Sequence, residues 1–255
     1  MQLAFNDFGS GAPLVILHGL LGSSGNWHTL ASKVFAEHVH VFTVDLRNHG
    51  RSFHHDRFDY PAMVEDLAAF MDAQGLEAAH VLGHSMGGKA AMHLALAHPR
   101  RVEKLVVVDI APKAYPPRHL ELLAALEALD PAAYGARREI DEALAARVPD
   151  RAVRQFLLKN LAYDTQEKTY GWQMNLPAIV RNYDRINTPV AEGPTFEGPT
   201  RFIRGGRSDY IADDDLPAIR RLFPEADLVT IDGAGHWVHA EQPEALAEAV
   251  LTFLR

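Results

Sequence analysis

The sequence contains no cysteine among its 255 residues. A disulfide framework, a thiol nucleophile and a cysteine-ligated metal are therefore excluded. The chain also lacks a basic run interleaved with aromatic residues, the pattern that neutralises phosphates, so nucleic-acid binding is not expected. Its 33 acidic and 25 basic residues leave a formal net charge of −8. An acidic balance of this size indicates only that the chain is soluble.

Long apolar runs are missing as well. No stretch approaches the roughly 18 residues that a membrane-spanning helix requires. The first residues, MQLAFNDFGSG, lack a basic segment followed by an apolar one. We therefore expect a cytoplasmic protein without a membrane span. The chain does contain 47% hydrophobic residues, enough for one large core, so one domain with an insertion fits better than two domains.

Strand-like apolar runs alternate with helical patterns along most of the chain. The strand-like runs lie at residues 14–17, 40–44, 79–82, 105–109, 200–204 and 228–231. The helical patterns lie at residues 26–37, 61–74, 87–98, 213–222 and 243–254. This alternation predicts an α/β fold with a mostly parallel central sheet and helices on both faces.

The alternation stops after Asp109, and residues 116–185 carry helical patterns only. Three amphipathic segments stand out there: PRHLELLAALEAL, ARREIDEALAARV and RAVRQFLLKNLA. Such an insertion is too long to be a bare loop. We predict that residues 113–189 form a helical cap over one end of the sheet, and that residues 1–112 and 190–255 form the core. Extra helices packed on a face of the sheet are the alternative.

The stretch VLGHSMGGKA places Ser85 between a strand-like run and a helical pattern. Gly83 and Gly87, two residues away on either side, allow the chain to reverse sharply there. The G-x-S-x-G spacing is typical of a nucleophile elbow, which holds a serine hydroxyl exposed on a strained turn. The alternative is a serine N-cap between loop glycines.

A serine hydroxyl is a poor nucleophile without a base, and histidine, with an unperturbed pKa near ~6.5, suits that role. His236 lies in DGAGHWVHAEQP, between the last predicted strand and the last predicted helix. We expect this glycine-containing loop to present it over the sheet edge. His239 is expected to be structural or exposed. His54 and His55 are expected to be surface residues, and no metal site is expected.

Two aspartates compete for the third position of such a site. Asp109 ends the run KLVVVD, whereas Asp209 lies in RGGRSDYI after a later strand. Either carboxylate would orient the imidazole and stabilise the imidazolium. The double glycine leaves the register open, because it brings either Ser208 or Asp209 to the functional position. The chain order of serine, acid and then His236 is that of the α/β-hydrolases.

The oxyanion formed during acyl transfer needs two N–H donors. We expect one from Met86, the residue after the nucleophile, and one from Leu20 in the loop HGLLGSSGNW. The polar stretch DLRNHGRS at residues 45–52 is expected to brace loops instead of performing chemistry. No phosphate-binding glycine motif occurs in the needed context.

Seven stretches together resemble the YbfF-type esterases of bacteria and their mitochondrial relatives in eukaryotes. They are HGLLGSSGNW, VDLRNHGRS, GHSMGGKAAM, VVVDIAP, WQMNLPAI, FIRGGRSDYI and AGHWVHAEQPEAL. The likeness runs from about residue 3 to residue 254 and includes the cap. It implies an α/β-hydrolase fold with a helical cap, and a serine ester hydrolase.

The resemblance also bears on the acid. In the bacterial relatives the aspartate of the VVVDIAP pattern resembles the triad acid, and the serine of GG-x-S bridges it to the histidine. These positions are Asp109 and Ser208 in this chain. Asp209 departs from the family pattern and places an extra carboxylate that could compete for His236. We favour Asp109 and keep Asp209 as the alternative.

The leading hypothesis is a carboxylesterase or thioesterase that forms an acyl-enzyme on Ser85. Its partner would be a small-molecule acyl ester or acyl-CoA thioester, and no metal or organic cofactor is expected. One alternative is a cofactor-free perhydrolase or haloperoxidase with the same triad. A second is a non-catalytic binding member of the fold. The sequence sets neither the acyl length nor the oligomeric state.

Overall fold

A seven-stranded sheet forms the centre of the computed structural model, which describes residues 2–190 and 193–255. Residues 191 and 192, at the predicted return from cap to core, lie outside the described residues, as does residue 1. The strand order is β1-β3-β2-β4-β5-β8-β9. The strands are β1 (Phe5–Phe8), β2 (Pro13–Leu17), β3 (His40–Val44), β4 (Ala79–His84), β5 (Val102–Val108), β8 (Thr200–Gly205) and β9 (Ala226–Ile231).

Every neighbouring pair of this sheet is parallel except β1 with β3. The mostly parallel sheet is therefore confirmed, and all six predicted strands are present. The sequence did not predict β1, whose four residues are half-buried or exposed. So short an edge strand carries too weak a hydrophobic pattern to be recognised.

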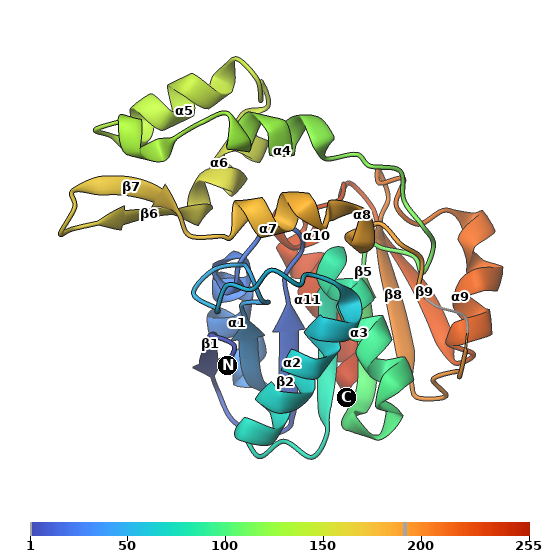
Figure 1. The fold of residues 1–255 in the computed structure, drawn as a ribbon. Coiled ribbons are helices and arrows are strands. Elements are labelled where there is room, and N and C mark those ends of the chain that lie inside the picture. The colour runs from blue at the N-terminus through green and yellow to red at the C-terminus, as the bar shows by residue number, and fades with distance from the viewer. Residues whose placement is uncertain (1, 191–192) are drawn as a thin grey trace.

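Helices cover both faces of the sheet (Figure 1). Neighbouring strand residues belong to different hydrophobic clusters. The cluster of Val81 includes residues of α2 (Tyr60–Ala73), α3 (Met86–Ala97) and α9 (Leu216–Leu222), whereas that of Leu82 includes residues of α1 (His28–Lys33) and α11 (Pro243–Leu254). Burial on both faces explains why the central strands read as continuous apolar runs. The short α10 (Val238–Glu241) precedes α11.

Between β5 and β8 the chain forms a group of elements that lies over one end of the sheet (Figure 1). They are α4 (Leu120–Glu127), α5 (Arg137–Ala145), α6 (Arg151–Leu157), β6 (Leu161–Asp164), β7 (Thr169–Trp172), α7 (Leu176–Arg181) and α8 (Tyr183–Ile186). Short 3₁₀ helices occur at Ser24–Trp27, Phe35–Glu37, Pro99–Arg101, Pro131–Ala133, Leu158–Asn160 and Asp213–Asp215. The division into a core and a cap at residues 113–189 stays a prediction.

The prediction of helices alone in this segment was wrong at residues 161–172, where β6 and β7 form an antiparallel hairpin. Tyr163 faces Tyr170 across the pair. The carboxylate of Asp164 accepts the N–H groups of Gln166 (2.8 Å) and Glu167 (3.0 Å), which closes the turn. This local turn chemistry overrides the helical pattern that ends with α6. None of the described helices is long and apolar enough to cross a membrane.

Candidate active site

Ser85 lies at the sharp turn between β4 and α3, with φ 52° and ψ −118°. A non-glycine residue in this region is strained. The neighbouring glycines make the turn possible, because a Cβ on Gly83 would overlap the backbone of Gly87, and one on Gly87 would overlap the backbone of Leu17 and His18. The Ser85 side chain makes no capping hydrogen bond, so the N-cap alternative has no support.

His236 stands between this serine and a buried acid. Its Nε2 lies 3.0 Å from Ser85 Oγ, and its Nδ1 donates to Asp109 Oδ2 over 2.8 Å. Because Nδ1 carries the proton that faces the carboxylate, Nε2 presents a lone pair to the serine hydroxyl. Tyr210 stacks on the imidazole with ring centroids 3.9 Å apart, which holds the ring plane in place.

Asp109 follows β5 and is fully buried, with a left-handed φ of 53°. Its Oδ1 accepts the N–H of Gly205 over 3.0 Å. Its Oδ2 accepts both the Ser208 hydroxyl and His236 Nδ1. A buried carboxylate is costly unless donors satisfy it, and three donors do so here.

Asp209 lies apart from this group. Its side chain is 72% exposed and forms an ion pair with Arg118 at 2.6 Å. The hydrogen bond from Arg118 lowers the pKa of the Asp209 carboxyl. The structure therefore brings Asp109 and Ser208 to His236 and leaves Asp209 at the surface.

The two expected oxyanion donors, Leu20 and Met86, line one cavity together with Ser85. Met86 is the first residue of α3, where a backbone N–H has no partner within the helix. Leu20 lies in the loop after β2. Among the residues that the structure describes, neither N–H group makes a hydrogen bond. Both are available to a developing negative charge, which the positive end of the α3 dipole also favours.

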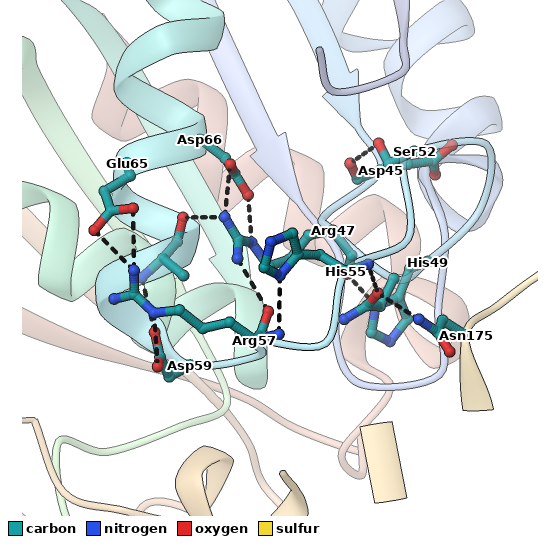
Figure 2. Close-up of polar contacts among 12 residues, drawn as sticks. Asp45, Arg47, His49, Ser52, His55, Arg57, Asp59, Glu65, Asp66 and Asn175 are labelled. Atoms are coloured by element: carbon teal, nitrogen blue, oxygen red, sulfur yellow. Dashed lines mark hydrogen bonds and ion pairs between the residues drawn. The ribbon is translucent and has the colours of Figure 1, made fainter. Parts of the chain in front are cut away.

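The polar stretch at residues 45–52 holds neighbouring loops together, as predicted, and Figure 2 shows several of its contacts. Asp45 accepts the N–H groups of Ser24 and Arg51, at 2.6 and 3.0 Å. Arg47 is buried and binds Asp66 through two nitrogens, at 2.5 and 2.8 Å. These contacts tie the loop that follows β3 to the one that follows β2, and to helix α2.

His49 links this braced stretch to the oxyanion loop. Burial lowers its pKa to about 3, so the ring is neutral. Its Nδ1 donates to the Arg47 carbonyl over 3.0 Å, and its Nε2 accepts the N–H of Leu21 over 3.1 Å. Leu21 follows Leu20 and has a φ of 58°, so the accepting imidazole fixes the backbone beside the expected donor.

Two further imidazoles lie around the site, and only His239 was named from the sequence. His84 lies directly before the nucleophile and its Nε2 donates to the His236 carbonyl over 2.8 Å. His239, expected to be structural or exposed, is buried and stacks on Trp27. Burial lowers the pKa of His84 and, for His239, brings it to about 4. Only the position of His84 in the elbow motif could have drawn attention to it.

Two small cavities meet at Ser85. The first, of about 50 Å³, is lined by His236 and Trp237 from the core and by Leu122 and Phe156 from the inserted segment. The second, of about 30 Å³, is lined by a more varied set. This set comprises Leu20, Tyr60, Ser85, Met86, Lys89, Ile110, Tyr115, Pro116, Arg118, His119, Ile186, Asn187 and Tyr210. A larger hollow of about 540 Å³ shares Phe156 and Trp237 with the first cavity. Across residues 2–190 and 193–255, no group of three or more acidic or imidazole side chains could hold a metal ion.

Comparisons with known proteins find related α/β-hydrolases that match almost the whole chain. A family model described as alpha/beta hydrolase fold matches residues 12–243. The chain is 42% identical to the sn-1-specific diacylglycerol lipase ABHD11 of Danio rerio, over 98% of this chain and 81% of that protein. It is 37% identical to esterase YbfF of Escherichia coli, over 95% of this chain and 93% of that protein. A solved structure titled marine microorganism esterase is 42% identical, with a TM-score of 0.95 and 99% of each chain covered.

Proposed function

This chain belongs to the alpha/beta hydrolase fold family and is a carboxylic ester hydrolase related to the YbfF-type esterases, and we propose that it acts through an acyl-enzyme on Ser85. The observation that carries the proposal is the hydrogen-bonded line from Ser85 Oγ through His236 to Asp109. A strained elbow, a base and a buried acid in this order are the parts that serine acyl transfer requires.

In the first half of the reaction, Ser85 Oγ attacks the acyl carbon and His236 Nε2 takes its proton. Asp109 stabilises the imidazolium that forms, without itself becoming protonated. The N–H groups of Leu20 and Met86 hold the oxyanion. His236 then protonates the leaving group as it departs, and a water molecule releases the acid by the same route.

Ser208 is proposed as a positioning residue. Its hydroxyl donates to the same Asp109 oxygen that accepts His236 Nδ1. The contact holds the carboxylate at the angle that the imidazole needs. It also supplies one of the donors that make a buried charge tolerable.

Small acyl esters or acyl-CoA thioesters are the proposed substrates. Cavities of about 30 and 50 Å³ beside Ser85 favour short groups on either side of the scissile bond. The names of the relatives, a diacylglycerol lipase and an esterase, support ester hydrolysis. A perhydrolase would use the same three residues, and peracid formation from an ester and hydrogen peroxide would reveal it.

Replacement of Ser85 by alanine tests the proposal. We expect kcat on nitrophenyl butyrate to fall on the order of 10⁶-fold, the loss that follows removal of the nucleophile in such a triad. A fluorophosphonate probe should label Ser85 in the wild-type protein and leave the variant unlabelled. The exposed Ser10→Ala variant is the matched control and should retain full activity. A folded Ser85→Ala variant that keeps more than about a hundredth of the activity would assign the nucleophile elsewhere.

A further inference from the structure

His119 lies directly before α4, in the segment between β5 and β8. It lines both of the cavities that meet at Ser85, and so do Leu20 and Ser85 itself. In the proposed mechanism Ser85 bonds to the carbonyl carbon and Leu20 faces the carbonyl oxygen. Three residues line both cavities, and two of them are thereby assigned to the carbonyl group. The third is His119, and the remaining heteroatom of the ester is its alkoxy oxygen.

The protonation of the leaving group by His236 places the alkoxy oxygen near His119. The leaving oxygen must come within reach of His236 Nε2, because this nitrogen protonates it. His236 lines the first cavity and does not line the second. The leaving group therefore lies in the first cavity and the acyl group in the second. The bond that breaks crosses the junction, beside the His119 ring.

Tyr183 on α8 contacts both the backbone and the ring of His119. The Tyr183 hydroxyl oxygen accepts the backbone N–H of His119 over 3.0 Å and lies 2.8 Å from its Nδ1. The hydroxyl still has one proton to donate, and when it donates that proton to Nδ1, this nitrogen is the acceptor. The ring proton then resides on Nε2. No hydrogen bond to Nε2 occurs within the described part of the chain.

The His119 ring is also neutral over the working range of an esterase. Burial, followed by the nearby His236 and Arg118, lowers its pKa to about 4. Tyr60 and Lys89, which also line the second cavity, donate to backbone carbonyl oxygens. Tyr115 likewise donates to the Tyr210 carbonyl over 2.5 Å.

We propose that His119 is a catalytic residue whose Nε2–H donates a hydrogen bond to the alkoxy oxygen of the substrate as the carbon–oxygen bond breaks. The electron pair of that bond passes to the alkoxy oxygen, which takes its proton from His236, while His119 keeps its own proton. Tyr183 is a positioning residue that holds the donating tautomer. The role rests on the proposed acyl-enzyme mechanism.

The contact has a consequence for substrate class. An alkoxide oxygen that gains charge in the transition state is a strong acceptor, and a donor aimed at it lowers the barrier. Thioether and thiol sulfur are weak acceptors. His119 therefore makes the site selective for oxygen esters over thioesters of the same acyl group, which decides between the two proposed substrate classes.

The test compares ethyl butyrate with S-ethyl thiobutyrate in the wild-type protein and in His119→Phe. We expect the ratio of the two kcat/KM values, ester over thioester, to fall about tenfold in the variant, the effect of one lost hydrogen bond. His98→Phe, at an exposed histidine after α3, is the matched control and should keep the wild-type ratio. An equal loss on both substrates, or no loss on either, would overturn the role of His119.

Two further variants separate hydrogen bonding from packing. His119→Gln retains an N–H donor near the Nε2 position and should keep the ratio within about threefold of wild type. Tyr183→Phe removes the hydroxyl that donates to Nδ1 and fixes the tautomer, and it should lower the ratio to a value between the wild type and His119→Phe. If His119→Phe kept the ester-to-thioester ratio closer to the wild-type value than His119→Gln, the role of His119 would be packing and not hydrogen bonding. Fluorophosphonate labelling of Ser85 monitors the acyl-enzyme mechanism separately, so its loss would count against the proposed function itself.

Discussion

Replacing Asp109 with asparagine tests the proposed arrangement at the group on which it most depends. The carboxylate makes different contacts through its two oxygens. Oδ1 accepts the N–H of Gly205, and Oδ2 accepts His236 Nδ1 together with the Ser208 hydroxyl. An asparagine that keeps the oxygen toward Gly205 must therefore place its NH₂ group where Oδ2 stood.

The consequence for catalysis follows from this geometry. An amide N–H facing Nδ1 of His236 stabilises the tautomer whose proton lies on Nε2. That nitrogen, 3.0 Å from Ser85 Oγ, can then no longer accept the serine proton. The same change of tautomer in a serine-protease triad lowers kcat by about 10⁴, and we expect a loss of this order in Asp109→Asn.

Asp209→Asn is the matched control, since it makes the same chemical change at the competing aspartate. The Asp209 side chain is 72% exposed and contacts Arg118 instead of His236. Exposed ion pairs contribute little, so we expect kcat/KM to change by less than about fivefold. Initial rates on nitrophenyl butyrate give kcat and KM for both variants, and circular dichroism checks that each is folded. A folded Asp109→Asn variant with nearly normal kcat, beside an inactive Asp209→Asn variant, would refute the assignment of the acid.

Two further predictions concern the histidines. Because only a neutral imidazole can accept the serine proton, His236→Ala should remove most of the activity, together with the rise of kcat/KM with pH that a general base produces. A pH profile of unchanged shape in that variant would transfer the role of base to another group. The second prediction concerns stability: burial lowers the pKa of His49 to about 3 and that of His239 to about 4, whereas both titrate near ~6.5 when unfolded. The unfolded chain therefore binds more protons below this pH, and each histidine should lower the free energy of unfolding by about 1.4 kcal/mol per pH unit as the pH falls from ~6.5 toward ~4. Urea unfolding at several pH values measures this slope, and a His49→Gln variant with an unchanged slope would contradict its assigned share.

Features that depend on short stretches of the chain could be predicted from the sequence. The elbow is encoded within about ten residues by a strand, two glycines and a helix, because only glycine tolerates the close backbone approach at Gly83 and Gly87. The central strands were recognisable because burial on both faces leaves them uniformly apolar. The β6–β7 hairpin was missed, since its pairing depends on a turn within a segment whose neighbours are helical.

Contacts between distant residues depended on the tertiary structure. Asp109 and His236 are 127 positions apart in the sequence. Their meeting requires the parallel pairing of β5 with β8 and of β8 with β9, which brings the loops after these strands to one edge of the sheet. Sequence spacing alone therefore left Asp109 and Asp209 as alternatives.

His119 shows the same limit more strongly. In the sequence it is one polar residue in the amphipathic segment PRHLELLAALEAL, with no motif around it. Its position at the junction of two cavities, and its contact with Tyr183, 64 residues later, depend on how the segment between β5 and β8 packs. The sequence by itself determined the class of fold and the elbow that carries the proposed nucleophile, because short-range backbone sterics and hydrophobic patterning encode both. Only the folded chain brought Asp109 to His236 and placed His119 beside Ser85, because these contacts join residues that no local pattern relates.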